Sequence, residues 1–148
     1  MNIVNGILGN YMLICAMIAY VAAQIMKFVI GIVRERRFSI GLLIASGGMP
    51  SSHSSTVCAL CVAAVKLHGV NSPYFAISFI LAAIVMYDAA GVRRAAGEQA
   101  KLINRIVADV WEGKTEYVQK NLKELIGHTP LQVLGGAVLG VVIPFIYT

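Results

Sequence analysis

The ten residues from Ser46 to Ser55 contain the chain's densest group of side chains that could do chemistry. They read Ser-Gly-Gly-Met-Pro-Ser-Ser-His-Ser-Ser. Glycines allow a tight turn, proline suits the start of a helix, and serine caps a helix or contacts an anion. Such a turn presents several backbone N–H groups to one phosphate-like anion, with Ser51 and Ser52 as contacts and His53 as a proton carrier. The alternative is a capped helix start with an incidental histidine.

A second histidine lies in a similar run, Gly-His-Thr-Pro, which begins at Gly127. Gln132 follows His128 by four residues, about one helical turn. Its side-chain oxygen can accept a hydrogen bond from a ring N–H and hold the imidazole in one tautomer. The third histidine, His68, is expected at the opposite membrane face, where we assign it a structural role.

Two cations are spaced so that they share one helix face. Lys27 precedes Arg34 by seven residues, which is close to two turns and about 10 Å along a helix axis. A lysine inside a membrane span is costly and usually faces a polar cavity. We therefore predict that both bind an anion, the alternative for Lys27 being a side chain that snorkels to the interface.

A third polar group follows an apolar segment, in the run Asp-Ala-Ala-Gly-Val-Arg-Arg that begins at Asp88. Its small residues let helices approach closely, and Arg93 and Arg94 could each fork onto phosphate oxygens. The alternative is that the arginines only set membrane orientation and that Asp88 forms a salt bridge with one of them.

Composition places the chain in the membrane. Of its 148 residues 58% are hydrophobic and only 13% charged, and the mean hydropathy is +0.76, which is too apolar for an ordinary soluble domain. The formal net charge of +5 is concentrated between apolar segments, which indicates orientation and contact with lipid headgroups. Basic residues do not alternate with aromatic ones, so we expect no nucleic-acid partner.

The predicted fold is an all-α integral membrane protein with a single domain over residues 1–148. Four short transmembrane helices are expected at about residues 11–33, 54–70, 73–90 and 130–147. The charged stretch at about 98–126 is expected to form amphipathic helices at the cytoplasmic surface. A short apolar link at residues 38–45 would dip into the membrane surface, in which case it is re-entrant.

Four spans put both termini on one side of the membrane and both basic regions on the other, which the positive-inside rule makes cytoplasmic. This topology predicts a multi-pass protein of the cell membrane. It also brings the chemistry-bearing ends together, because Lys27, His53, Asp88 and His128 all lie near the cytoplasmic ends of their spans. A single pocket lined by cations and histidines at that face would suit a phosphate.

Two other patterns concern packing. Gly136 and Gly140 form a small-xxx-small motif that serves either packing within the chain or a homo-oligomer. The cysteines, Cys15, Cys58 and Cys61, lie in apolar segments without a second pair or a histidine cluster. We read them as small buried side chains and expect no disulfide, no metal and no other cofactor.

The motifs resemble those of the divergent branch of the type 2 phosphatidic acid phosphatase and vanadium haloperoxidase superfamily. That superfamily's first signature is lysine, six residues, arginine and proline, and Lys27 and Arg34 match it with Glu35 in the proline's place. Its second, Pro-Ser-Gly-His, resembles the four residues that end at His53, with Ser52 in place of glycine.

The third signature is Ser-Arg, five residues, histidine, three residues and aspartate. His128 and Gln132 keep its final spacing with glutamine in place of aspartate, and Leu122 stands where the arginine would be. We infer that Arg93 or Arg94 would supply that missing cation. The divergent branch is also similar to this chain in three longer runs: Ser-Gly-Gly-Met-Pro-Ser-Ser-His, Asp-Ala-Ala-Gly-Val-Arg-Arg and Gly-His-Thr-Pro.

The resemblance implies a phosphatase without a metal, in which His128 attacks phosphorus and His53 protonates the leaving oxygen. The phosphate oxygens would be held by the cations and the serine loop: Lys27, Arg34, Ser51, Ser52, Arg93 and Arg94. Gln132 would orient the imidazole, or Asp88 would supply the charge that an amide lacks. The location implies a lipid phosphate or an isoprenyl (di)phosphate as substrate. The alternatives are a non-catalytic protein that binds an anionic lipid and a small transporter or channel component.

Overall fold

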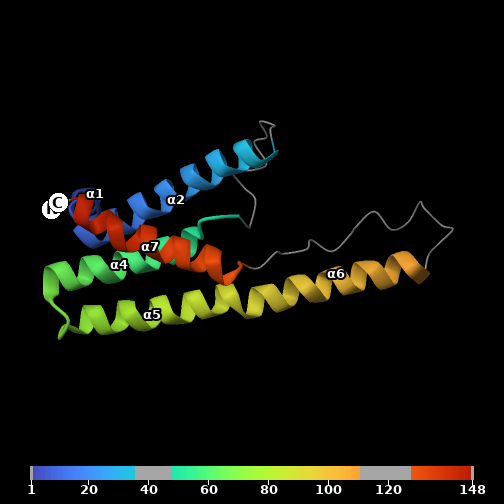
Figure 1. Ribbon diagram of the computed structural model, residues 1–148. Coiled ribbons are helices and arrows are strands. Elements are labelled where there is room, and N and C mark those ends of the chain that lie inside the picture. Colours follow the sequence, from blue (N-terminus) through green and yellow to red (C-terminus); the bar gives the residue numbers. More distant parts are fainter. Residues whose placement is uncertain (1, 36–47, 111–127, 148) are drawn as a thin grey trace.

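The computed structural model describes residues 2–35, 48–110 and 128–147, which form helices and no strand (Figure 1). The helices, in chain order, are α1 (Ile3–Leu8), α2 (Tyr11–Glu35), α4 (Ser52–His68), α5 (Pro73–Ala90), α6 (Val92–Val110) and α7 (Pro130–Ile146). The link at residues 38–45 and the part of the amphipathic stretch after residue 110 lie outside the described ranges.

Side-chain caps define where three of the long helices begin. The hydroxyls of Ser51, Ser72 and Thr129 each accept a hydrogen bond from the backbone N–H three residues later, at the starts of α4, α5 and α7. Proline at the first position also favours the starts of α5 and α7, since it has no N–H to satisfy there. These caps therefore determine the residues at which α4, α5 and α7 begin.

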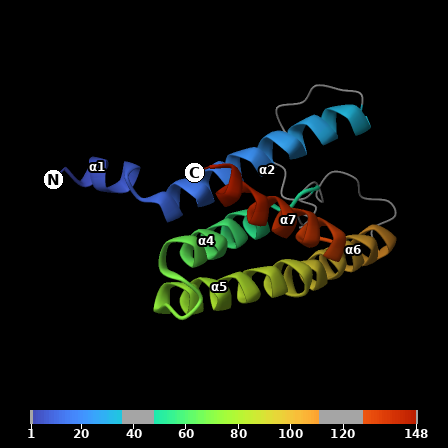
Figure 2. The same cartoon turned by 60° about the vertical axis from the view of Figure 1, so that its left-hand side comes forward.

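Helix α4 is the central element, and α2, α5 and α7 pack around it (Figure 2). Its residues 54–65 are all buried or half-buried. Small side chains permit this close packing, because Ala59, Ala63 and Ala64 on α4 are fully buried. A helix enclosed on all sides needs no continuous apolar surface, which explains how α4 accommodates several serines.

Helix α7 approaches α4 most closely at two glycines. A Cβ atom added at Gly140 would lie 2.8 Å from Cys58 Cβ and would collide with the Ser55 carbonyl oxygen. A Cβ at Gly136 would lie 3.0 Å from Ser54 Cβ. The sequence predicts that this motif serves either packing within the chain or a homo-oligomer, and these contacts are of the first kind.

Two described stretches are long and apolar enough to cross a membrane: Tyr11–Val33 and Pro73–Val107. Pro130–Ile146 is apolar but shorter, and its 17 residues span about 26 Å. Helix α4 has the same length and is more polar. Only part of the predicted set of four spans therefore meets the length and composition expected of a helix that crosses a bilayer by itself.

Helix α6 begins at Val92, earlier than the predicted amphipathic segment at residue 98, and continues from α5 past Gly91 (Figure 1). Its apolar side chains Leu102, Ile103 and Ile106 are exposed. Glu98 and Lys101 form an ion pair at 3.5 Å, one turn apart on its polar side. The periodicity in the sequence correctly predicts an amphipathic helix here.

At the opposite end of the bundle, Lys66 ties three helices together. Its ammonium donates hydrogen bonds to the Tyr11 hydroxyl, at 2.9 Å, and to the Pro144 carbonyl. The Tyr11 hydroxyl lies 2.7 and 2.8 Å from the carbonyl oxygens of Pro144 and Tyr147, which share its one hydrogen. These bonds satisfy carbonyls at the C-terminal end of α7, which have no intrahelical donor.

We predict that Gly140→Ala lowers the free energy of unfolding by about 1–3 kcal/mol, because the added methyl group meets backbone and Cys58 Cβ. Denaturant titration in detergent micelles would measure the change. The matched control is Gly135→Ala, where the nearest atom is the mobile Met49 terminal methyl, at 3.1 Å. Equal stability of the two variants would contradict the close contact between α4 and α7.

Candidate functional site

Four helix ends lie toward the same end of the bundle: the C-termini of α2 and α5 and the N-termini of α4 and α7, with the last turns of α2 projecting away from the other three (Figure 1). Each of these ends carries one of the predicted polar motifs. Helix N-termini attract anions, because their first N–H groups are unpaired within the helix and their dipoles are positive there. The serine loop and the His128 loop both lead into such N-termini.

A backbone hydrogen bond joins these two loops. Ser51 N–H donates to the Gln132 carbonyl, at 3.0 Å. Beside it, Met49 and Pro50 pack over Gly135 on α7. The second and third motifs of the sequence are therefore in direct contact although 81 residues separate Ser51 from Gln132.

Lys27 reaches the same place from α2. Its side chain is 9% exposed, and the aliphatic stem lies against Gly48, where an added Cβ would be 3.3 Å from Lys27 Cγ. Gly48 has a φ of 90°, which favours glycine at this contact. Lys27 thus lies beside the serine loop, where it can pair with an anion.

His128 is held at the end of α5. Its backbone N–H donates to the Ala89 carbonyl, at 3.2 Å, and its side chain is 8% exposed. Asp88, half-buried, is the residue before Ala89. The structure therefore places Asp88 and His128 on adjoining segments, as the predicted topology requires.

The Gln132 amide determines the tautomer of His128. Gln132 Oε1 accepts a hydrogen bond from Thr129 N–H and lies 3.1 Å from His128 Nδ1. A backbone N–H requires an oxygen at that position, so the amide orientation is fixed. Nδ1 must then be the protonated nitrogen, which leaves Nε2 with a lone pair in the neutral ring.

The serine loop uses its hydroxyls largely within α4. Ser51 Oγ accepts from Ser54 N–H and from the Ser54 hydroxyl, at 3.4 and 3.0 Å. Ser51 is fully buried and Ser52 nearly so, whereas His53 is exposed. The sequence predicts that these serines either cap a helix or contact an anion, and Ser51 caps α4. Ser52 and His53 occupy the first two helical positions, whose N–H groups have no acceptor within the helix.

The predicted arginines also lie at this end. Arg34 is in the last turn of α2, and Arg93 and Arg94 are in the first turn of α6. His68 lies at the far end of α4, where its ring packs on Tyr74 with 4.5 Å between centroids. That position agrees with the structural role predicted for His68.

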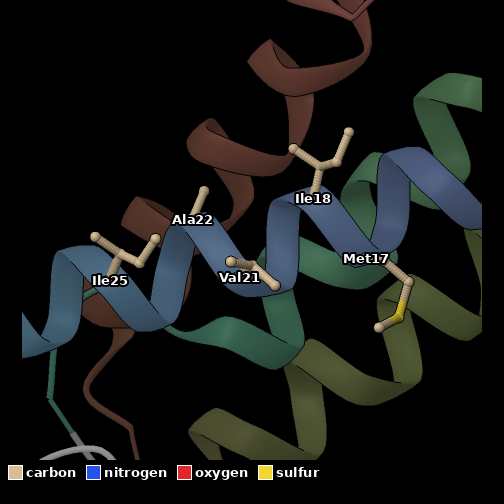
Figure 3. Close-up of a pocket in the computed structure, with 5 residues that line it drawn as sticks. All are labelled: Met17, Ile18, Val21, Ala22 and Ile25. Atoms are coloured by element: carbon tan, nitrogen blue, oxygen red, sulfur yellow. The ribbon is translucent and has the colours of Figure 1, made fainter.

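A groove of about 380 Å³ lies elsewhere, on the outer face of α2 (Figure 3). Its lining is apolar and consists of Met17, Ile18, Val21, Ala22 and Ile25. It holds no group that could bind a phosphate. Among the described residues no cluster of side chains could hold a metal, and the cysteines are free thiols.

Sequence reasoning missed one feature of the site, the capping box at the start of α7. Thr129 Oγ1 accepts from Gln132 N–H while Gln132 Oε1 accepts from Thr129 N–H. The pattern of threonine followed three residues later by glutamine is a recognised signal for this motif. It gives Gln132 a structural role in addition to its contact with His128.

The helical fold, with two histidine-bearing helix starts and a buried lysine at one end, is consistent with the class that the family comparison supports, a phosphatase-related membrane protein. The particular family is shown by comparison with known proteins: the chain belongs to the Divergent PAP2 family, whose model matches residues 8–143. It is 41% identical over 150 residues to "Uncharacterized membrane protein YuiD" of Bacillus subtilis (strain 168), covering 95% of each chain. No solved structure matches it.

We predict that Gln132→Met destabilises the start of α7 by about 1–2 kcal/mol, because Thr129 N–H and His128 Nδ1 both lose their acceptor. NMR of the imidazole nitrogens is expected to show the His128 ring changing from one tautomer to a mixture. Leu131→Met, at a neighbouring exposed position, should alter neither property. A single unchanged tautomer in Gln132→Met would contradict the assignment.

Proposed function

We propose that the protein hydrolyses a lipid phosphate or an isoprenyl (di)phosphate by transferring the phosphoryl group to His128. The observation that supports this most directly is the His128–Gln132 contact, because it leaves Nε2 unprotonated and nucleophilic. The meeting of this loop with the serine loop and Lys27 adds an anion-binding environment.

The reaction has two balanced steps. His128 Nε2 attacks phosphorus and forms an N–P bond while the bond to the lipid oxygen breaks, and His53 gives that oxygen a proton. Water then attacks the phosphohistidine, gives a proton to His53 and releases inorganic phosphate. Charge on the transferring group is stabilised by Lys27, by the arginines Arg34, Arg93 and Arg94, and by N–H groups at the start of α4, including that of Ser52.

The location of the site supports a membrane-bound substrate. We place the site at the cytoplasmic face, with four helices crossing the bilayer, because both basic regions then lie on the inner side. Lys27 lies eight residues before the end of α2 at Glu35, about 12 Å along its axis, which is the depth of a lipid headgroup and its linkage. Binding of a water-soluble phosphate ester would not need a cation so far below the membrane surface.

A second candidate is a protein that binds an anionic lipid without hydrolysing it. The neutral Gln132 favours this candidate, because an amide orients an imidazole but does not stabilise an imidazolium as a carboxylate does. The half-buried Asp88 is the carboxylate nearest in sequence to the His128 contact at Ala89, and we assign it the supporting charge.

We predict that His128→Ala abolishes phosphate release and the phosphohistidine, and that His53→Ala slows release about a hundredfold to ten-thousandfold. A panel of lipid phosphates in detergent, with inhibition by vanadate, measures both. His68→Ala is the matched control, since His68 lies at the other end of α4. Equal phosphate release by wild type and His53→Ala would refute the enzyme, whereas lipid binding without any release would support the binding protein.

We predict that Lys27→Met weakens binding of the phosphate lipid about tenfold to a hundredfold, because a charge-assisted contact is lost. Lys101→Met changes the net charge equally at an exposed position on α6 and should have little effect. Calorimetric titration of the detergent-solubilised protein separates the two variants. Equal affinity of both variants would show that Lys27 only snorkels.

A further inference from the structure

One buried polar atom on α2 is unsatisfied. Gln24 Oε1 has no hydrogen-bond partner, and it is the one buried side-chain nitrogen or oxygen of the described residues for which this is so. Its amide nitrogen donates to the Tyr20 hydroxyl, at 3.2 Å. Gln24 lies within the apolar stretch Tyr11–Val33, where water is not at hand to complete the bond.

Gln24 belongs to a polar row on one face of α2. Tyr20, Gln24 and Lys27 are spaced by four and three residues, so they share that face. The row leads from the candidate site toward the middle of the span, with Gln24 about 4.5 Å deeper than Lys27. Ile18, Ala22 and Ile25, which line the apolar groove, lie on another face of α2.

A bound lipid would follow the same direction. If its phosphate lies beside Lys27, its backbone and acyl chain extend toward the bilayer centre, past Gln24. The group that passes Gln24 is then the one next to the phosphate ester.

We propose that Gln24, oriented by Tyr20, is a specificity-determining residue that binds a hydroxyl adjacent to the phosphate of the lipid. A hydroxyl both donates and accepts, so it satisfies the amide whichever way its oxygen and nitrogen are turned. An isoprenyl phosphate has no such group and would leave the amide unpaired. This inference rests on the proposed function for the position of the phosphate, and it narrows the substrate to hydroxyl-bearing lipid phosphates.

The test measures binding and turnover of two lipids by the full chain in detergent: an oleoyl glycerol phosphate with one free hydroxyl beside the phosphate ester, and its deoxy analogue. Wild type should bind the hydroxyl lipid about three- to tenfold more tightly, the range of one net hydrogen bond. In Gln24→Met that ratio should fall to about one, with binding of the deoxy lipid unchanged. Tyr20→Phe should lower the ratio in the same direction.

Ile25→Met, on the lipid-facing side, is the control and should keep the wild-type ratio. A ratio near one in wild type, or an equal ratio in wild type and Gln24→Met, would overturn the hydroxyl subsite even if both lipids are hydrolysed. Selective binding without phosphate release would support the subsite and refute the phosphatase. Binding of neither lipid would overturn the hydroxyl subsite.

Discussion

The close approach of α7 to α4 is the contact on which the rest of the structure depends. Lipid tails are as apolar as leucine, so helices in a membrane are held together by close packing and polar contacts. Gly136 and Gly140 let the α7 backbone reach the carbonyls of Ser51 and Ser55. The same approach brings Ser51 N–H to the Gln132 carbonyl, so one packing constraint also joins the two histidine loops.

Polar groups in the interior fall into two sets. Those of α4 are satisfied locally: the Ser55 hydroxyl donates to the Ala19 carbonyl at 3.1 Å, and Thr56 to the Ser52 carbonyl at 2.8 Å. On α2, by contrast, Gln24 Oε1 is buried and lacks a partner among the described residues. Unsatisfied polar groups inside an apolar bundle are expected at functional sites, where a ligand completes them.

Much of the fold and of the site could be predicted from the sequence, because caps, prolines and apolar runs act locally. The starts of α5 and α7 coincide with Pro73 and Pro130, and the periodicity of the charged stretch indicates α6. The central position of α4 could not be predicted, since apolar runs give length but not which neighbours enclose a helix. The contact between Lys66 and the end of α7 was missed for the same reason.

Gln132 stands where the superfamily signature has an aspartate, and this difference changes the charge beside His128. As an amide it caps α7 and fixes the His128 tautomer without placing a negative charge beside the phosphate. In the proposed site, a neutral residue at this position leaves a larger net positive charge than a carboxylate would, which favours binding of a phosphate dianion in the ground state. A carboxylate would instead stabilise the positive charge that the imidazole gains as the phosphohistidine forms. Because binding that is equally strong in ground and transition states does not raise turnover, glutamine at this position would, under the proposed function, favour tight lipid binding with slow hydrolysis.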